Sequence, residues 1–403
     1  MGHSHSHGDV HVEVGTRAKQ ILVGFLVALA ILTLAGLLWL WPTPSEIRAG
    51  IPQVESLENV QDLNGTIAAI DDGCTGQFES SYGEVVCLVF TVDVVDGPEA
   101  GTQQTLEVAG PPTQSGLRVG DEIQLTRIDT GDGPMYSYKD IDRTPVFIVL
   151  GILFVLAVMA VARWKGLFAL LGLVFAGFVL IGFIIPGILL GKPGIAVALV
   201  GSTAIMFVVL YVAHGISIRT STALAGTMLG LAVTAGLGAI SVQAARLAGF
   251  SDERDMDLQQ LAGNINFQDL LIAAIIIGGL GVLNDTTITQ SSAVFELRAA
   301  APNLSRREIF ASGMRIGRDH IASTIYTIVF AYAGSALVII MLLYFTSDGL
   351  LSTLNQEMFA SEIIRTLGSA IGLILSVPIT TAIAAATVGP AKDLPQRAAE
   401  PTH

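Results

Sequence analysis

The chain has 403 residues, of which 52% are hydrophobic and only 14% are charged. Soluble domains carry about 25% charged residues, so this composition excludes an ordinary soluble globular protein, a disordered chain and a disulfide-rich miniprotein. The net charge of −13 arises in one segment, because residues 42–144 hold 18 acidic and 5 basic side chains and the remainder is balanced. Nucleic-acid binding requires a basic face, which this chain lacks. The composition predicts a membrane protein with one acidic soluble segment.

Eight runs are long and apolar enough to cross a bilayer, which takes about 20 mostly apolar residues. Seven of them contain no Asp, Glu, Lys or Arg, and the sixth contains only Asp285. The first run ends in Trp39-Leu-Trp41 and is longer than the core of a signal peptide, so we interpret it as a retained anchor. The predicted spans are residues 20–45, 144–162, 166–191, 193–218, 220–245, 270–295, 320–347 and 366–391.

The basic residues between the spans predict the orientation of the chain. If the N-terminus is cytoplasmic, twelve Lys or Arg residues lie on the cytoplasmic side and four lie in the short outer loops. This bias satisfies the positive-inside rule through all eight crossings. We therefore expect both termini in the cytoplasm and the acidic segment outside.

The acidic segment has the pattern of a small β-domain. Alternating or β-branched runs such as EVVCLVFTVDVV and DEIQLTRID are separated by Gly, Pro and Asp turns. About 100 residues suffice for a small barrel or sandwich. The predicted fold is mainly α, a polytopic bundle of eight spans with an extracytoplasmic β-domain between spans 1 and 2. Its expected parts are a cytoplasmic His-containing tail 1–19, an anchor 20–41, the β-rich domain 42–144, a seven-span domain 145–390 and a cytoplasmic tail 391–403.

Both cysteines of the chain, Cys74 and Cys87, lie in the acidic segment. They are either two buried thiols or a disulfide. Because an outer domain lies in an oxidising compartment, we favour the disulfide. In either case the expected role is structural.

The sixth span has a polar stripe at helical spacing, with Asn284 and Thr286 beside it. A carboxylate in a span costs about 2.5–3.5 kcal/mol on insertion scales. Asp285 is therefore expected to face protein or water and to have a functional role, although a structural ion pair is the alternative. The stripe consists of Gly278, Gly281, Asp285, Thr289, Ser292 and Glu296.

Polar stripes continue in the last two spans. The seventh carries Arg315, Asp319, Ser323 and Thr327 on one face, with Arg318 and His320 beside it; the eighth carries Ser369, Gly372, Ser376 and Thr380 and contains Pro378. Three adjacent helices of this kind are expected to enclose a hydrated or ion-paired cavity. Alternatively the hydroxyl groups only join helices, and Arg315 with Asp319 only anchors a helix end.

The N-terminal tail contains a histidine cluster formed by His3, His5, His7 and His11. Zinc or nickel suits such ligands, but a tail without supporting groups binds metal weakly. We favour a polar leader over a metal site. The motifs HExxH, GxSxG and GxxxxGK[ST] are absent from the sequence, so no enzymatic activity and no cofactor are expected.

The string GVLNDTTITQSSAVFELRAAAPNLSRREIFASGMRIGRDHIASTIYT, followed by EIIRTLGSAIGLILSVPIT, resembles the bacterial YibE/F family. The resemblance is strongest over residues 275–388 and extends over nearly the whole chain. Members usually show Asp-Val at the acidic position, where this sequence has Asp285-Thr286. The resemblance implies a multi-pass protein of the bacterial cell membrane and brings no activity with it.

Two functions fit these residues. The first is a secondary transporter or ion pathway, driven by an ion gradient because no ATP-binding motif is present. Its predicted site is centred on Asp285 and includes Asn284, Thr286, Thr289, Ser292, Glu296, Arg315, Arg318, Asp319, Ser323 and Ser376, with Arg315 and Asp319 as an inner gate. The alternative is a sensor or scaffold that acts through its outer domain. An intramembrane hydrolase using Asp285 and Asp319 has no supporting motif. The expected partners are the lipid bilayer, an unknown ion or small solute and, since the glycine-rich faces permit it, a second copy of the chain.

Overall fold

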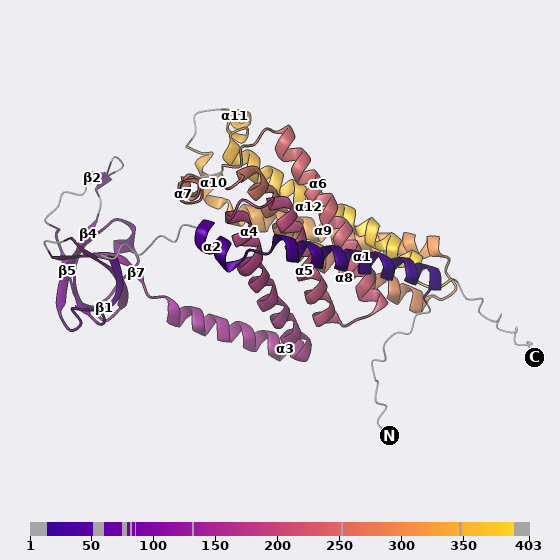
Figure 1. The fold of residues 1–403 in the computed structure, drawn as a ribbon, viewed down its shortest axis with the longest axis horizontal. Helices are drawn as coiled ribbons and strands as arrows, with labels where there is room; N and C mark the ends of the chain where they lie inside the picture. Colours follow the sequence, from indigo (N-terminus) through magenta and orange to yellow (C-terminus); the bar gives the residue numbers. More distant parts are fainter. Residues whose placement is uncertain are drawn as a thin grey trace, which may run out of the picture. The chain divides into compact units, whose positions relative to one another are not determined.

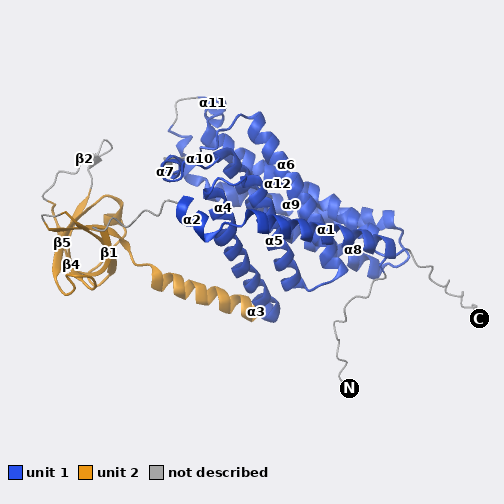
Figure 2. Cartoon of the chain, in the orientation of Figure 1, with its two compact units in different colours: residues 1–51, 162–403 blue, residues 52–161 orange. Residues whose placement is uncertain are grey.

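The computed structural model describes residues 14–50, 60–74, 79–80, 83–84, 86–130, 133–250, 253–345 and 349–390. The chain divides into two compact units (Figure 2). One comprises Met1–Ile51 with Ala162–His403 and is helical; the other, Pro52–Val161, contains the β-strands and the first part of a long helix. The β-strands therefore fall within the acidic segment, as predicted.

Five antiparallel strands form the β unit as a half-barrel. Its sheet order is β5-β4-β1-β6-β7, and the two edge strands contact one another. The long strand β1 pairs with β6 through its first half and with β4 through its second half, so it bends around the core. That core is apolar and includes the fully buried Phe90, Val92, Ile123 and Leu125. The strands are β1 (Val60–Asp72), β4 (Cys87–Val94), β5 (Gln103–Ala109), β6 (Glu122–Asp129) and β7 (Pro134–Ile141), with the short hairpin β2 (Glu79–Ser80) and β3 (Gly83–Glu84) and the 3-10 turn η1 (Pro111–Gln114).

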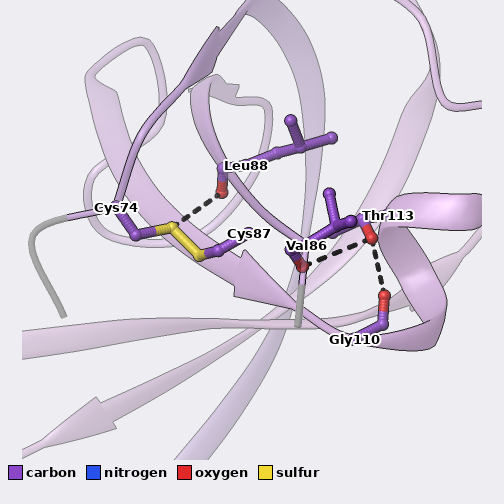
Figure 3. The surroundings of a disulfide bond; sticks show 6 residues. All are labelled: Cys74, Val86, Cys87, Leu88, Gly110 and Thr113. Atoms are coloured by element: carbon purple, nitrogen blue, oxygen red, sulfur yellow. Dashed lines mark hydrogen bonds between the residues drawn. A yellow bond between two sulfur atoms is a disulfide. The ribbon is translucent and has the colours of Figure 1, made fainter. Parts of the chain in front are cut away.

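A disulfide joins Cys74, two residues after the end of β1, to Cys87 at the start of β4 (Figure 3). Their Cα atoms are 5.9 Å apart. Beside it, the Thr113 hydroxyl donates to the Gly110 carbonyl at 2.7 Å, which holds the turn after β5. The disulfide thus joins the two ends of the connection between β1 and β4, and this connection contains the hairpin β2–β3.

Among the described residues of the β unit, one charged side chain is buried, and it is paired. Arg127 is 8% exposed and donates to both carboxylate oxygens of Glu99 at 2.9 Å. The Tyr136 hydroxyl donates to the same carboxylate at 3.0 Å. The hydrogen bonds from Arg127 hold the pKa of the Glu99 carboxyl below its ordinary value, and the bond from Tyr136 adds to this effect.

The helical unit has a centre of three helices, α6, α8 and α12, which lie side by side (Figure 1). Helices α5 and α9 pack against this centre, and α1 contacts α5, α6 and α12. The helices are α1 (Thr16–Leu40), α2 (Pro44–Gly50), α3 (Thr144–Val179), the π-helical turn η2 (Leu180–Ile184), α4 (Ile185–Leu189), α5 (Gly194–His214), α6 (Ile218–Ala244), α7 (Glu253–Leu261), α8 (Phe267–Ala300), α9 (Arg306–Ser335), α10 (Leu337–Leu342), α11 (Leu350–Leu354) and α12 (Glu357–Thr387).

Among the described residues, six helical stretches are long and apolar enough to cross a membrane, which indicates a membrane-embedded protein. The predicted number of eight is not confirmed. The predicted span 144–162 and all but the last two residues of the span 166–191 fall in the single stretch Thr144–Leu189, although Arg163 interrupts the helix there with a φ of 51°. The predicted span 320–347 is divided between α9 and α10, because the first helix ends at Ser335.

Candidate functional site

Polar side chains fill the contacts between the central helices. We call this set the polar seam, and none of its members is more than 2% exposed. Such an interior is expected in a membrane protein, where small and hydroxyl residues join helices and apolar side chains face the lipid. The seam comprises Thr227 and Thr234 of α6, Thr286, Thr287 and Gln290 of α8, and Ser369, Ser376, Thr380 and Thr381 of α12.

Glycines bring α6 and α12 into close contact along the seam. A carbon added at Gly226 would collide with the Thr380 hydroxyl, and one added at Gly372 would collide with the Thr234 hydroxyl. Between these two contacts, Gly230 lies against Ser376. Each helix thus contributes a residue every four positions, in antiparallel order, and each hydroxyl residue occupies the space left by a glycine.

Hydrogen bonds join α8 to its neighbours at several levels along the seam. The hydroxyl groups of Thr287 and Thr227 lie 2.6 Å apart, which links α8 to α6. One turn further along α8, the Gln290 amide donates to the Gly313 carbonyl of α9 and to the Thr381 hydroxyl of α12, both at 2.8 Å. The side chain of Gln290 therefore holds three helices together.

Two seam hydroxyls, those of Thr286 and Thr380, have no hydrogen-bond partner among the described residues. Other seam threonines bond a carbonyl of their own helix, as Thr234 does to Gly230 at 3.0 Å and Thr381 to Val377 at 2.7 Å. A buried polar group without a partner costs about 1–3 kcal/mol. These two hydroxyls are therefore candidates for a binding function within the seam; outside it, the buried hydroxyls of Ser202 and Thr222 also lack a partner among the described residues.

Asp285 lies on the opposite face of α8. It is exposed, as are Thr289 and Glu296, and Ser292 is half-buried. Asp285 makes no hydrogen bond or ion pair with any residue that the structure describes. Successive helical residues are about 100° apart, so Thr286 points into the seam while Asp285 points away from it. The described residues therefore do not enclose Asp285.

The predicted inner gate is not assembled either. Arg315, Arg318, Asp319 and Ser323 are all exposed on α9, and the Arg315 guanidinium donates to the Ser312 hydroxyl at 3.0 Å, with no ion pair to Asp319. Half-buried His320 has an unpartnered ring nitrogen, and the side-chain amide oxygen of half-buried Asn284 also lacks a partner.

The polar face of α12 is buried as a unit. Ser376 is fully buried and donates to the Leu373 carbonyl at 2.7 Å. Gly230 of α6 lies against Ser376, and α12 also packs against α8 and α9, which are the helices of the sixth and seventh predicted spans.

A sequence model of the YibE/F-like protein family matches residues 150–390, which is more than half of the chain. The chain belongs to the YibE/F-like family. No curated protein and no solved structure matches it. The matched residues contain the whole polar seam and the exposed stripes of α8 and α9, whereas the strands of the β unit lie outside the match.

The seam residues of α6 were missed in the sequence of this YibE/F-like protein. Thr227 and Thr234 lie in a span without charges, so nothing drew attention to them. A signal was nevertheless present, because Gly226, Gly230 and Thr234 repeat every four residues. The same spacing of small and hydroxyl residues occurs in Gly372, Ser376 and Thr380, so a search for matching stripes would have paired these helices.

The described part of this YibE/F-like chain contains no group of three or more His, Cys, Asp or Glu that would hold a metal ion. The predicted metal ligands His3, His5, His7 and His11 lie outside the described residues. One hollow of about 330 Å³ lies between α1, α6 and α12, and another of about 340 Å³ lies between α9, α10 and α12; both are apolar.

Proposed function

We propose that this protein moves a small ion or polar solute across the membrane along the polar seam. The observation that carries the proposal is the pair of buried, unpartnered hydroxyls of Thr286 and Thr380. Such groups are costly in a structure that needs only stability, and they supply oxygen ligands of the kind that hard cations prefer. The centre of the pathway is accordingly the seam, and Asp285 on the exposed face is not part of it.

The expected topology is the one predicted from the sequence. The chain crosses a bacterial cell membrane eight times, with the break at Arg163 separating spans 2 and 3, both termini in the cytoplasm and the β unit outside. The basic residues of the loops support this orientation. The disulfide of the β unit supports it independently, since disulfides persist in oxidising compartments.

Transport requires the seam to open, and its construction supports such a movement. The side chains nearest to Gly226 and Gly372 are short threonines, and we propose that α6 and α12 slide past one another there. Pro378 lies inside α12 and lacks an N–H, so the Ile374 carbonyl has no donor four residues later. That carbonyl is a further oxygen ligand beside the seam. The driving force is an ion gradient, and we propose neither enzymatic chemistry nor a cofactor.

The test is cation flux into sealed proteoliposomes that contain the full chain. Uptake of H⁺, Na⁺ and K⁺ is followed with ion-sensitive dyes under an imposed gradient. Replacing both Thr286 and Thr380 by Val should lower the flux at least about tenfold, because each loses a ligand hydroxyl worth roughly 1 kcal/mol. Thr33→Val is the matched control, since Thr33 is a buried threonine of α1 that bonds its own helix at Leu29.

The outcome separates the parts of the proposal. Flux that survives the double substitution unchanged would remove the seam as the pathway. Wild-type flux no higher than that of empty vesicles for all three cations would overturn the cation-transport proposal.

The second candidate function is that of a sensor or scaffold. It is favoured by the β unit, which has its own apolar core and disulfide and contains most of the acidic segment. Deleting residues 45–143 discriminates between the two functions. Retained flux would support transport, whereas loss of every phenotype with intact membrane insertion would support the sensor.

A further inference from the structure

The exposed stripe of α8 lies deep inside the membrane-length part of the fold. The start of α1 marks one end of the helical unit, where the Gly15 amide donates to the Thr387 carbonyl of α12. Thr381 lies six residues before Thr387 on α12 and is hydrogen-bonded to Gln290 of α8. Asp285 lies five residues before Gln290, and therefore five residues further from that end of the helical unit. At 1.5 Å per residue, Asp285 is about 16 Å from that end, which is about half the thickness of the hydrocarbon core.

An exposed carboxylate at that depth needs a polar neighbour. Leaving it in contact with lipid costs about 2.5–3.5 kcal/mol on insertion scales and more in simulations. The described residues of its own helical unit offer Asp285 no hydrogen bond. The apolar segment 145–161, which belongs to the other unit, has no hydroxyl, amide or charged side chain and offers none either.

The exposed stripe of α9 has the complementary chemistry at the same depth. Gly317 lies against Gln290, and Gly313 lies against Val294, so α8 and α9 run antiparallel with these positions level. Counting along both helices from Gly317 and Gln290 places Ser323 within one residue of the level of Asp285, and Arg318 about one turn away. Both α9 side chains are exposed. An arginine side chain reaches across about one turn, so it can pair with the carboxylate.

We propose that α8 of one copy packs against α9 of a second copy about a two-fold axis along the membrane normal. In this arrangement Asp285 of each copy accepts hydrogen bonds from Arg318 and Ser323 of the partner subunit. Because a two-fold interface is isologous, each such contact occurs twice. Gly281 supports the close approach of the helices, since a carbon added there has no other atom within 4 Å in the single chain.

Charge reversal in trans is the first test. Asp285→Arg in every copy places two arginines opposite one another, and Arg318→Asp in every copy places two aspartates opposite one another. Each variant alone should lower the dimer fraction at least tenfold. Mixing the two differently tagged variants restores one native and one reversed contact in every heterodimer. Co-purification of the two tags from membranes should therefore return to the wild-type level.

Cysteine cross-linking is the second test, and it does not depend on charge. The native cysteines are joined to one another, so an introduced cysteine is the only free thiol of its chain. Gly281→Cys in one copy and Thr327→Cys in the other lie at matching levels and should form a disulfide-linked dimer on mild oxidation. Val174→Cys of α3, which is also on an exposed apolar face, replaces Thr327→Cys as the control and should form no link.

The proposal is overturned by a wild-type chain that is monomeric by light scattering in detergent and gives no cross-link in membranes. It is also overturned if Gly281→Cys reacts with a membrane-impermeant thiol reagent as fast as a soluble thiol, because water would then cover the stripe. Neither readout measures flux, so this inference and the transport function can fail independently.

Discussion

The two faces of α8 carry similar polar residues, but one face is buried against other helices and the other is exposed. The face toward α6 and α12 carries Thr286, Thr287 and Gln290, all buried among glycines and hydroxyl groups. The opposite face carries Asp285 and Thr289, which are exposed. Polar residues on a membrane helix therefore do not by themselves mark one enclosed site. What distinguishes the faces is the neighbouring helix, which supplies glycines on one side and nothing within the described chain on the other.

The largest expected difference in stability is between adding a methyl group to a glycine of the seam and adding one to an exposed glycine. Gly372→Ala should destabilise the protein by about 1–3 kcal/mol or more, because the new carbon collides with Thr234 and forces α6 and α12 apart. Gly236→Ala, at an exposed position of α6, has free space and should stabilise the helix by about 0.5–1 kcal/mol. Thermal unfolding of the full chain in detergent measures both. Equal effects would contradict the assigned packing of the seam.

The second contrast removes a polar side chain from each face. Gln290→Leu should cost about 1–3 kcal/mol, because it breaks two hydrogen bonds and leaves the Gly313 carbonyl without that donor. Thr289→Val removes an exposed hydroxyl and should change the stability by less than about 0.5 kcal/mol. The comparison is made by the shift in melting temperature, with Gln290→Glu as a variant that keeps the size of the side chain.

The comparison also explains what the sequence could predict. Long apolar runs, the β-strand pattern and the YibE/F resemblance are local signals, and they indicated a helical membrane protein with a β unit and its family correctly. The stripe containing Asp285 was identified correctly as one helical face, but helical spacing does not say which helix packs against that face. The pairing of Gly226 with Thr380 depends on two helices far apart in the sequence, and therefore only the structure revealed it.

The third contrast compares a satisfied and an unsatisfied hydroxyl on the same face. Thr286→Val removes a buried group without a partner and should raise stability by about 1 kcal/mol. Thr287→Val breaks the bond to Thr227 and should lower stability by about 1 kcal/mol. Thermal unfolding of the two variants shows whether each substitution raises or lowers the stability. A destabilised Thr286→Val would mean that its hydroxyl already has a partner, and would weaken its assignment as a ligand.

The smallest expected effect concerns Glu99, a paired carboxylate of the β unit, which contrasts with the unpaired Asp285 of α8. Arg127 donates to Glu99 through two hydrogen bonds and holds the pKa of Glu99 below its ordinary value of 4.5. The stabilisation from this pair is complete above that value and is lost as the pH falls through the lowered pKa of the folded state.

The β unit of the full chain should therefore become more sensitive to pepsin as the pH falls from about 4.5 to about 2. Pepsin should cleave the Glu99→Gln variant faster than the wild type at the upper end of this range, and the cleavage rate of this variant should depend less on pH. The Glu122→Gln variant, changed at an exposed position on β6, should be cleaved like the wild type. A wild-type cleavage rate that does not follow protonation would show that Arg127 is held by packing and not by its charge partner.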